Sequence, residues 1–118
     1  MNDSIIRTRY ADALVKYVRE TGNGESVCQQ AEKLSRVLQE VPDLSRMIAA
    51  KDVVPNAKKR ALLRTALGEP MTPELMRFVN LLLANGRIGS LRMILVDFLD
   101  RYRRSRGLRK AQIGRAHV

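Results

Sequence analysis

Side chains that could carry out covalent or metal chemistry are sparse in this 118-residue sequence. Cys28 is the single cysteine and His117 the single histidine, so the chain cannot form an internal disulfide or assemble a Cys/His zinc site. A catalytic Ser-His-Asp or Cys-His set needs a histidine beside its nucleophile, and the only histidine is the penultimate residue. "GNG" and "NGR" are helix-breaking turns rather than phosphate-binding loops. The sequence therefore predicts a protein that is not an enzyme and that holds neither a catalytic metal nor a cofactor.

The remaining candidates for chemistry have ordinary structural explanations. Cys28 falls in a segment with helical apolar period, where we expect a small core residue rather than a nucleophile. Asp97 and Asp100 are three residues apart and could share one face of a helix. We expect them to form ion pairs with Arg101 and Arg104, each four residues further on. A lone cysteine is typical of a reducing compartment.

Charge is the strongest compositional feature. The chain has 22 basic and 12 acidic residues, a net charge of +10, and six of the basic residues lie between positions 101 and 110. Such a balance favours an acidic partner, which could be nucleic acid, anionic lipid or an acidic protein surface. A solvated helical surface is the plainer alternative, because cations are stabilised near the C-terminus of a helix. Scarce aromatic residues and the lack of a recognition helix weaken a nucleic-acid interpretation, and the ordinary core spacing of 88–110 weakens a membrane-surface one.

Turn-forming residues divide the chain into segments of helical period. The predicted fold is an all-α six-helix bundle in one domain, because 45% apolar residues over this length can form a core. We expect Pro55 at the first position of the fourth helix, Thr72 as the N-cap of the fifth and Gly86 in the left-handed conformation that ends it. Neither a signal peptide nor a membrane span of ~20 apolar residues is expected. The predicted helices cover 4–21, 25–40, 43–50, 55–67, 73–85 and 88–105.

The fifth predicted helix differs from the others. Only Glu74, Arg77 and Asn80 interrupt its apolar residues, so it is apolar on nearly every side. Such a helix is either central to its bundle or covered by something that the chain does not supply. In a domain of this size central burial is the simpler interpretation, and an apolar groove for a partner helix is the alternative.

Three stretches, in this order, resemble the N-terminal domain of the delta subunit of the rotary ATP synthase. Its mitochondrial counterpart is the oligomycin-sensitivity-conferring protein. The stretches are "RYADALVKYV" (9–18), "VPDLSRMIAAKDVVPNAKKRALL" (41–63) and "FVNLLLANGRIGSLRMILVDFLDRYRRSRG" (78–107). The likeness covers residues 4 to about 112 and includes the Asn-Gly-Arg turn between the last two helices.

The resemblance implies a non-catalytic stator subunit that takes part in ATP synthesis and proton transport. It would lie peripherally at the cytoplasmic face of the cell membrane, without spanning it, and would bind no nucleic acid. Its partners would be the N-terminal helix of an alpha subunit, held between the first and fifth helices, and the b subunits of the peripheral stalk, held by a separate C-terminal domain. Together with the surplus apolar face of the fifth helix, it implicates these partner-binding residues: Ile6, Tyr10, Ala13, Leu14, Tyr17, Phe78, Leu81 and Leu82.

The end of the sequence departs from the family's pattern. Residues 1–112 correspond to the helical N-terminal domain, and "RGLRKAQI" matches the point at which the family continues into its C-terminal domain. The chain then ends in "IGRAHV", the translation of ATC GGA AGA GCA CAC GTC, which is a common sequencing adapter. We therefore expect residues 113–118 to be a non-native tail and His117 to carry no function. If so, a small basic nucleic-acid-binding protein stays the alternative to the stator interpretation, since the net charge remains strongly positive.

Overall fold

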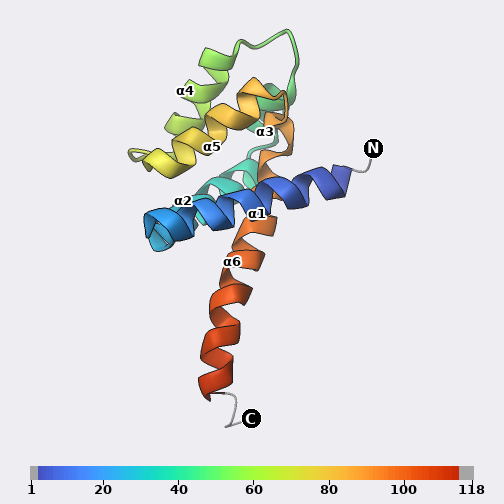
Figure 1. The fold of residues 1–118 in the computed structure, drawn as a ribbon. Coiled ribbons are helices and arrows are strands. Elements are labelled where there is room, and N and C mark those ends of the chain that lie inside the picture. Colours follow the sequence, from blue (N-terminus) through green and yellow to red (C-terminus); the bar gives the residue numbers. More distant parts are fainter. Residues whose placement is uncertain (1–2, 115–118) are drawn as a thin grey trace.

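The computed structural model describes the backbone of residues 3–114 and the side chains of residues 3–106. Over these residues the chain forms helices and contains no strand, which confirms the predicted all-α six-helix bundle (Figure 1). The tail 113–118, with His117, lies outside the residues whose side chains are described. The elements are α1 (Asp3–Thr21), α2 (Gly24–Glu40), α3 (Pro42–Ala49), α4 (Asn56–Leu67), α5 (Pro73–Ala84), a 3-10 turn η1 (Ile88–Ser90) and α6 (Leu91–Gly114).

The helix ends follow the predicted turn chemistry with one correction. The Thr72 hydroxyl accepts a hydrogen bond from the Leu75 N–H at 3.2 Å, so Thr72 is the N-cap of α5. Gly86 has a φ of 68°, the left-handed conformation expected just after that helix. Pro55 is not the first residue of α4, because its ψ of 153° is extended and the helix begins at the next residue.

The sixth helix begins later and continues further than predicted. Ile88–Ser90 form a separate 3-10 turn, and α6 then runs from Leu91 to Gly114 rather than ending near 105. Gly89 allows this turn to approach α3, because a Cβ added there would lie 3.3 Å from the Ala49 Cβ. The predicted segment 88–105 therefore contains a tight contact with α3 followed by a longer helix.

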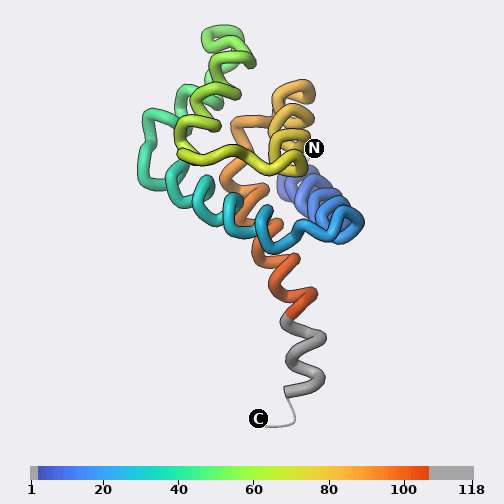
Figure 2. The backbone as a smooth tube through the Cα atoms, turned by 90° about the vertical axis from the view of Figure 1, so that its left-hand side faces the viewer, coloured from blue at the N-terminus to red at the C-terminus, as the bar shows by residue number. Residues whose placement is uncertain are grey.

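Helix α6 is the central element of the bundle. It packs most extensively against α1 and α2, which cross it, while α3 and α5 contact the 3-10 turn η1 just before it and α4 packs against α2, α3 and α5 (Figures 1 and 2). Its later turns extend beyond the other helices (Figure 1). The core is built almost entirely from aliphatic residues, as the composition predicted. The largest fully buried side chains are Leu14, Val18, Leu34, Leu38, Leu63, Leu67, Leu75, Leu82, Leu91, Ile94, Leu95 and Phe98.

A buried amide fixes the start of α5 relative to α2. Gln30 on α2 is only 6% exposed. Its Nε2 donates to the Glu69 carboxylate at 2.9 Å and to the Pro70 carbonyl at 2.8 Å, and its Oε1 accepts from the Thr72 N–H at 2.8 Å. One side chain thus provides hydrogen-bond partners for two part-buried backbone groups of the α4–α5 loop.

Candidate partner-binding groove

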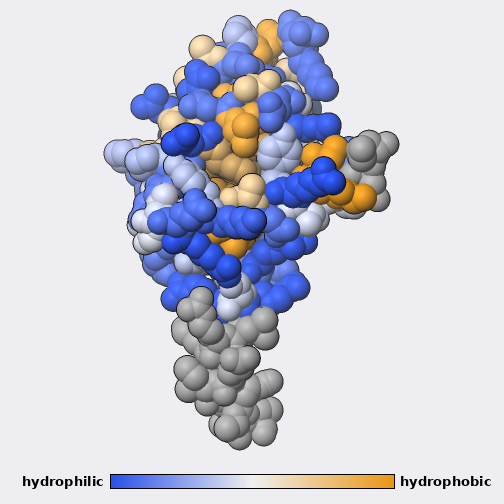
Figure 3. Space-filling model, in the orientation of Figure 1, coloured by the Kyte–Doolittle hydropathy of each residue, from blue (hydrophilic) through white to orange (hydrophobic). Residues whose placement is uncertain are grey.

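Helix α5 has an inner face in the core and an outer face that is open beside α1. Phe78 and Leu82 are 5% and 0% exposed, whereas Leu81 is 44% exposed. A hollow of about 520 Å³ lies between this outer face and α1. Figure 3 shows an apolar strip between α5 and α1, bordered by hydrophilic residues. We call this hollow the α1–α5 groove, and it is lined by Ala13, Leu14, Tyr17, Arg77, Phe78, Asn80 and Leu81.

Helical spacing explains why these residues share one groove. Ala13 and Tyr17 are four apart on α1, and Arg77 and Leu81 are four apart on α5, so each pair lies on one helix face. Leu14, which is 1% exposed, belongs to the core and to the lining at once. Ala13 is exposed and small, so the α1 backbone can be approached closely there. The groove therefore has an apolar floor and a low wall on the α1 side.

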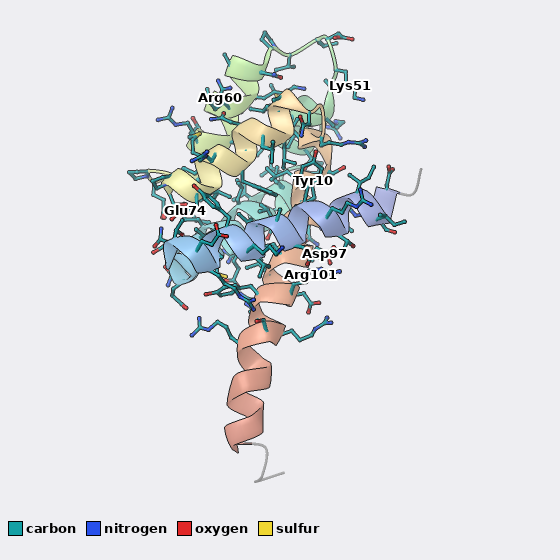
Figure 4. All side chains as sticks on the ribbon, viewed as in Figure 1. Tyr10, Lys51, Arg60, Glu74, Asp97 and Arg101 are labelled. Carbon is teal, nitrogen blue, oxygen red and sulfur yellow. The ribbon has the colours of Figure 1, made fainter. Side chains whose placement is uncertain are left out.

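Polar contacts hold the aromatic side chains beside the groove. Tyr10 meets Phe78 edge to face, with ring centroids 6.4 Å apart, and its hydroxyl accepts a hydrogen bond from Asn85 Nδ2 at 2.9 Å. In Figure 4 Tyr10 lies between α1 and α5. The Arg77 guanidinium lies over the Tyr17 ring, 5.7 Å from its centroid. These contacts restrict the orientations of the Tyr10 and Tyr17 rings.

The structure places five of the eight residues predicted as partner-binding in the groove lining. Tyr10 is half-buried and borders the groove through its contact with Phe78. Ile6 is half-buried nearer the start of α1, and Leu82 is fully buried, so neither lines the groove. Sequence reasoning missed Arg77 and Asn80, which line it. The available signal was helical spacing: Arg77 lies three residues before Asn80 and four residues before Leu81, so the three side chains lie on one side of the helix.

Glu74 ties the start of α5 to the turn between α1 and α2. Its side chain is largely buried, and its Oε1 accepts a hydrogen bond from Asn23 Nδ2 at 3.1 Å. This hydrogen bond, followed by one from Thr21, lowers the pKa of the Glu74 carboxyl below its ordinary value. The contact fixes the end of the groove at which α1 finishes and α5 begins (Figure 4).

Ion pairs along α6 agree with the sequence prediction. Asp97 pairs with Arg101 at 3.9 Å, and Asp100 pairs with Arg104. Arg101 also reaches Asp12 on α1 at 3.1 Å, so it joins the two helices. The two aspartates are thus ion-pair partners, as expected, and they form no paired-carboxylate site.

The arginines at the end of the described part of α6 pair with α2. Arg103 lies 3.0 Å from Glu32, and Arg106 lies 2.6 Å from Glu25 and 5.7 Å from the centroid of the Tyr102 ring. We call this set the α2–α6 charged face. It uses the basic end of α6 to bridge two helices of the same chain, a role that the sequence pattern did not reveal.

Cys28 lies behind the α2–α6 charged face. Its side chain is 8% exposed, and burial raises the pKa of its thiol to about 11. A thiol with a raised pKa is a poor nucleophile at neutral pH. This confirms the prediction that Cys28 is a small core residue.

The described residues show neither a metal centre nor a membrane span. Within 3–106 no group of three or more His, Cys, Asp or Glu side chains could hold a metal ion. Among the helices described, none is both long and apolar enough to cross a bilayer. The α1–α5 groove is a candidate functional site because it is an open hollow with a largely apolar lining.

Comparison with known proteins gives a consistent result. The chain is similar to the delta subunit of the organellar chromatophore ATP synthase of Paulinella chromatophora, with 31% identity over 98 residues, or 83% of this chain and 53% of that protein. It is similar to ATP synthase subunit delta of Synechococcus sp. (strain CC9605), with 27% identity over 108 residues, 92% of this chain and 59% of the relative. It is also similar to ATP synthase subunit delta of Phocaeicola vulgatus, with 28% identity over 109 residues, which are 92% of this chain and 59% of the relative. No solved structure matches.

The chain thus spans just over half the length of the curated relatives it matches. The family model described as "ATP synthase delta (OSCP) subunit" matches residues 6–117 of the chain. That range includes helices α2 to α6, all of α1 except its first three residues, and every residue that lines the groove. The chain belongs to the ATP synthase delta (OSCP) subunit family.

Proposed function

We propose that this chain supplies the head-binding domain of the stator in a rotary, proton-translocating ATP synthase. Family membership supports a structural, non-catalytic role that links parts of the complex. The α1–α5 groove binds the N-terminal helix of an alpha subunit of the catalytic head. The b subunits of the peripheral stalk are contacted through a C-terminal domain of the whole protein, and the assembled subunit lies peripherally at the cytoplasmic face of the membrane.

The observation that carries this proposal is the open apolar groove between two helices that are themselves fixed in the core. Helix-in-groove recognition needs an apolar floor for the i, i+3, i+4 residues of the guest and polar groups at its edges. Leu14, Phe78 and Leu81 provide the floor, and Arg77 and Asn80 provide the edge. The lining extends from Arg77 to Leu81 on α5, about 6 Å or one helical turn, and α5 as a whole is about 18 Å long, so a guest helix could continue along it beyond the hollow.

The arginine-rich end of α6 gives no comparable support to nucleic-acid binding. Arg103, Arg104 and Arg106 each pair with a carboxylate of their own chain. A binding surface for phosphates would present such cations unpaired. Nucleic-acid binding therefore stays a prediction that rests on the basic composition alone, and the salt dependence of DNA affinity tests it.

Ala13→Asp tests the groove. A carboxylate at this exposed position stays hydrated in the free protein, but it must be desolvated when an apolar helix docks. Binding of an alpha-subunit N-terminal peptide, measured by calorimetry, should weaken by more than ~2 kcal/mol, the scale of an interface hot spot. The melting temperature, followed by circular dichroism, should hardly change.

Ala57→Asp is the matched control, since Ala57 is an exposed helical alanine on α4 and does not line the groove. It introduces the same charge and should leave peptide affinity unchanged. If Ala13→Asp unfolds the chain, Ala13 is a core residue. If Ala13→Asp leaves both folding and binding unchanged, the guest helix docks elsewhere and the proposal is wrong.

A further inference from the structure

A second hollow, of about 580 Å³, lies away from the groove lining. It is formed by the loop between α3 and α4 and by the turn between α5 and α6, and none of its lining residues lines the α1–α5 groove. Lys51 marks the α3–α4 loop in Figure 4. We propose that this hollow binds a phosphate group, held by Lys59 and by the N-terminus of α4.

Lys59 is the first reason. It is 5% exposed and lines the hollow, yet its ammonium group makes no hydrogen bond or ion pair with any other described residue. The Lys59 ammonium is not among the fully enclosed, unpartnered side-chain atoms of the described residues, so it keeps some accessible surface, and Lys59 lines the hollow. Burying most of a lysine side chain without a partner for its charge costs free energy, and a bound anion would offset this cost by pairing with the ammonium group.

The start of α4 is the second reason. Pro55 and Asn56 line the same hollow, and α4 begins at Asn56. Pro55 provides no side-chain cap, and the first turn contains no acidic residue. The first N–H groups of a helix have no intrahelical acceptor, and the helix dipole makes that end electropositive. Because no cap of the chain satisfies these N–H groups, they are available to the same anion as Lys59.

The charge around the hollow favours a phosphate over a single carboxylate. Lys51 and Arg87 line it together with Lys59, against one acidic residue, Asp52. Arg87 has only a long contact, 4.0 Å, with Asp3. Three cations and one carboxylate leave an excess of about two positive charges, which matches the −1.5 to −2 of a phosphate monoester near pH 7. The volume also falls in the range of ~300–1,000 Å³ typical of small-molecule sites.

Titration of the ¹⁵N-labelled chain with inorganic phosphate, at constant ionic strength set by chloride, tests this site. Saturable amide shifts are expected for Asn56, Ala57 and Lys58 and for the turn 86–90. Lys59→Met removes the charge with little change in shape and should weaken phosphate binding at least ~10-fold, whereas Lys59→Arg should retain it. Lys58→Met is the matched control, because Lys58 is exposed on the same helix and does not line the hollow.

Equal weakening by Lys58→Met and Lys59→Met would mean non-specific attraction to a basic chain and would overturn the proposal. So would shifts that do not saturate or that spread over the whole surface. Ala13→Asp should leave phosphate binding intact, so this site and the α1–α5 groove can fail separately.

Co-sedimentation with phosphatidate vesicles, against phosphatidylcholine vesicles, identifies the source of the phosphate. Sedimentation that requires Lys59 assigns the site to a lipid headgroup. Saturable binding of inorganic phosphate without sedimentation assigns it to a soluble phosphate.

Discussion

The α1–α5 groove and the α2–α6 charged face differ in whether their side chains find partners within the bundle. In the groove, Leu81 in the apolar floor and Ala13 on the α1 side remain exposed. On the charged face, Arg103 and Arg106 meet Glu32 and Glu25 of the same chain. The charges of one region therefore have partners within the protein, while the apolar surface of the other has none.

This difference indicates which region needs a partner. Exposed ion pairs exchange hydration for contacts of similar free energy, so the charged face gains little by being covered. Apolar surface gains about 25 cal/mol for each Å² removed from water. Although net charge is the most visible feature of the composition, the unsatisfied apolar face of α5 is the better guide to function.

The largest effect that tests this contrast comes from two neighbouring leucines on α5. Leu82→Ala should lower the free energy of unfolding by about 2–5 kcal/mol, because Leu82 is fully buried and its removal leaves a cavity. Leu81→Ala should cost less than ~1 kcal/mol of stability, since its side chain is 44% exposed, but it should weaken peptide binding by ~1–2 kcal/mol. Urea unfolding and calorimetry measure the two quantities.

Each leucine is the control for the other, because the substitution is identical and the positions are adjacent. Equal loss of stability in both variants would show that Leu81 belongs to the core. Unchanged binding in a folded Leu81→Ala variant would show that the outer face of α5 is not the docking surface.

Much of the fold could be predicted because the determinants are local. The apolar period located the helices. The Thr72 hydroxyl caps the start of α5, and Gly86 takes the left-handed conformation just after its end. The misplaced start of the sixth helix depended on a contact between distant segments. Gly89 forms a 3-10 turn against Ala49, which no local pattern around residue 89 reveals.

The site could be predicted less completely, for a related reason. Ala13 and Phe78 were identified because family resemblance and surplus apolar character converge on them. Helical period gives the face on which a residue lies but not the height of the neighbouring helix, so Leu82 was included although it is fully buried. Arg77 and Asn80 were read as interruptions, whereas they line the groove.

A smaller effect concerns the frame of the groove and depends on pH. The hydrogen bond from Asn23 lowers the pKa of Glu74 in the folded chain. Its stabilisation is therefore fully present above the ordinary carboxyl pKa of about 4.3 and is lost as the pH falls through the lowered value. Glu74→Gln should be less stable than the native chain by about 1 kcal/mol at pH 6, with the difference shrinking below pH ~4.

Urea unfolding of both chains at pH 6, 4 and 3 measures this difference. The other carboxyl groups titrate alike in the two chains and cancel from the comparison. A difference that does not change with pH would mean that Glu74 acts by packing alone. Since Glu74 lies at the start of α5, acid should loosen this end of the groove while the apolar floor stays intact.

The smallest expected effect comes from the two arginines of the α2–α6 charged face together with Arg104, which pairs with Asp100 within α6. Replacing Arg103, Arg104 and Arg106 together with glutamine should change the affinity for an alpha-subunit peptide by less than ~10-fold. These arginines pair with Glu32, Asp100 and Glu25, and none of them lines the groove. Affinity of the native chain should likewise vary little between low and high salt, because apolar burial is not screened.

The same variant separates the stator proposal from nucleic-acid binding. If the charged face bound phosphates of a nucleic acid, affinity for a DNA duplex would fall steeply with salt, and neutralising three contacts would flatten that dependence. If the face only bridges α2 and α6, the native chain and the triple variant should bind DNA with the same weak dependence. A peptide affinity that drops more than ~10-fold in the triple variant would instead extend the docking surface to the end of α6 and erase the contrast between the two regions.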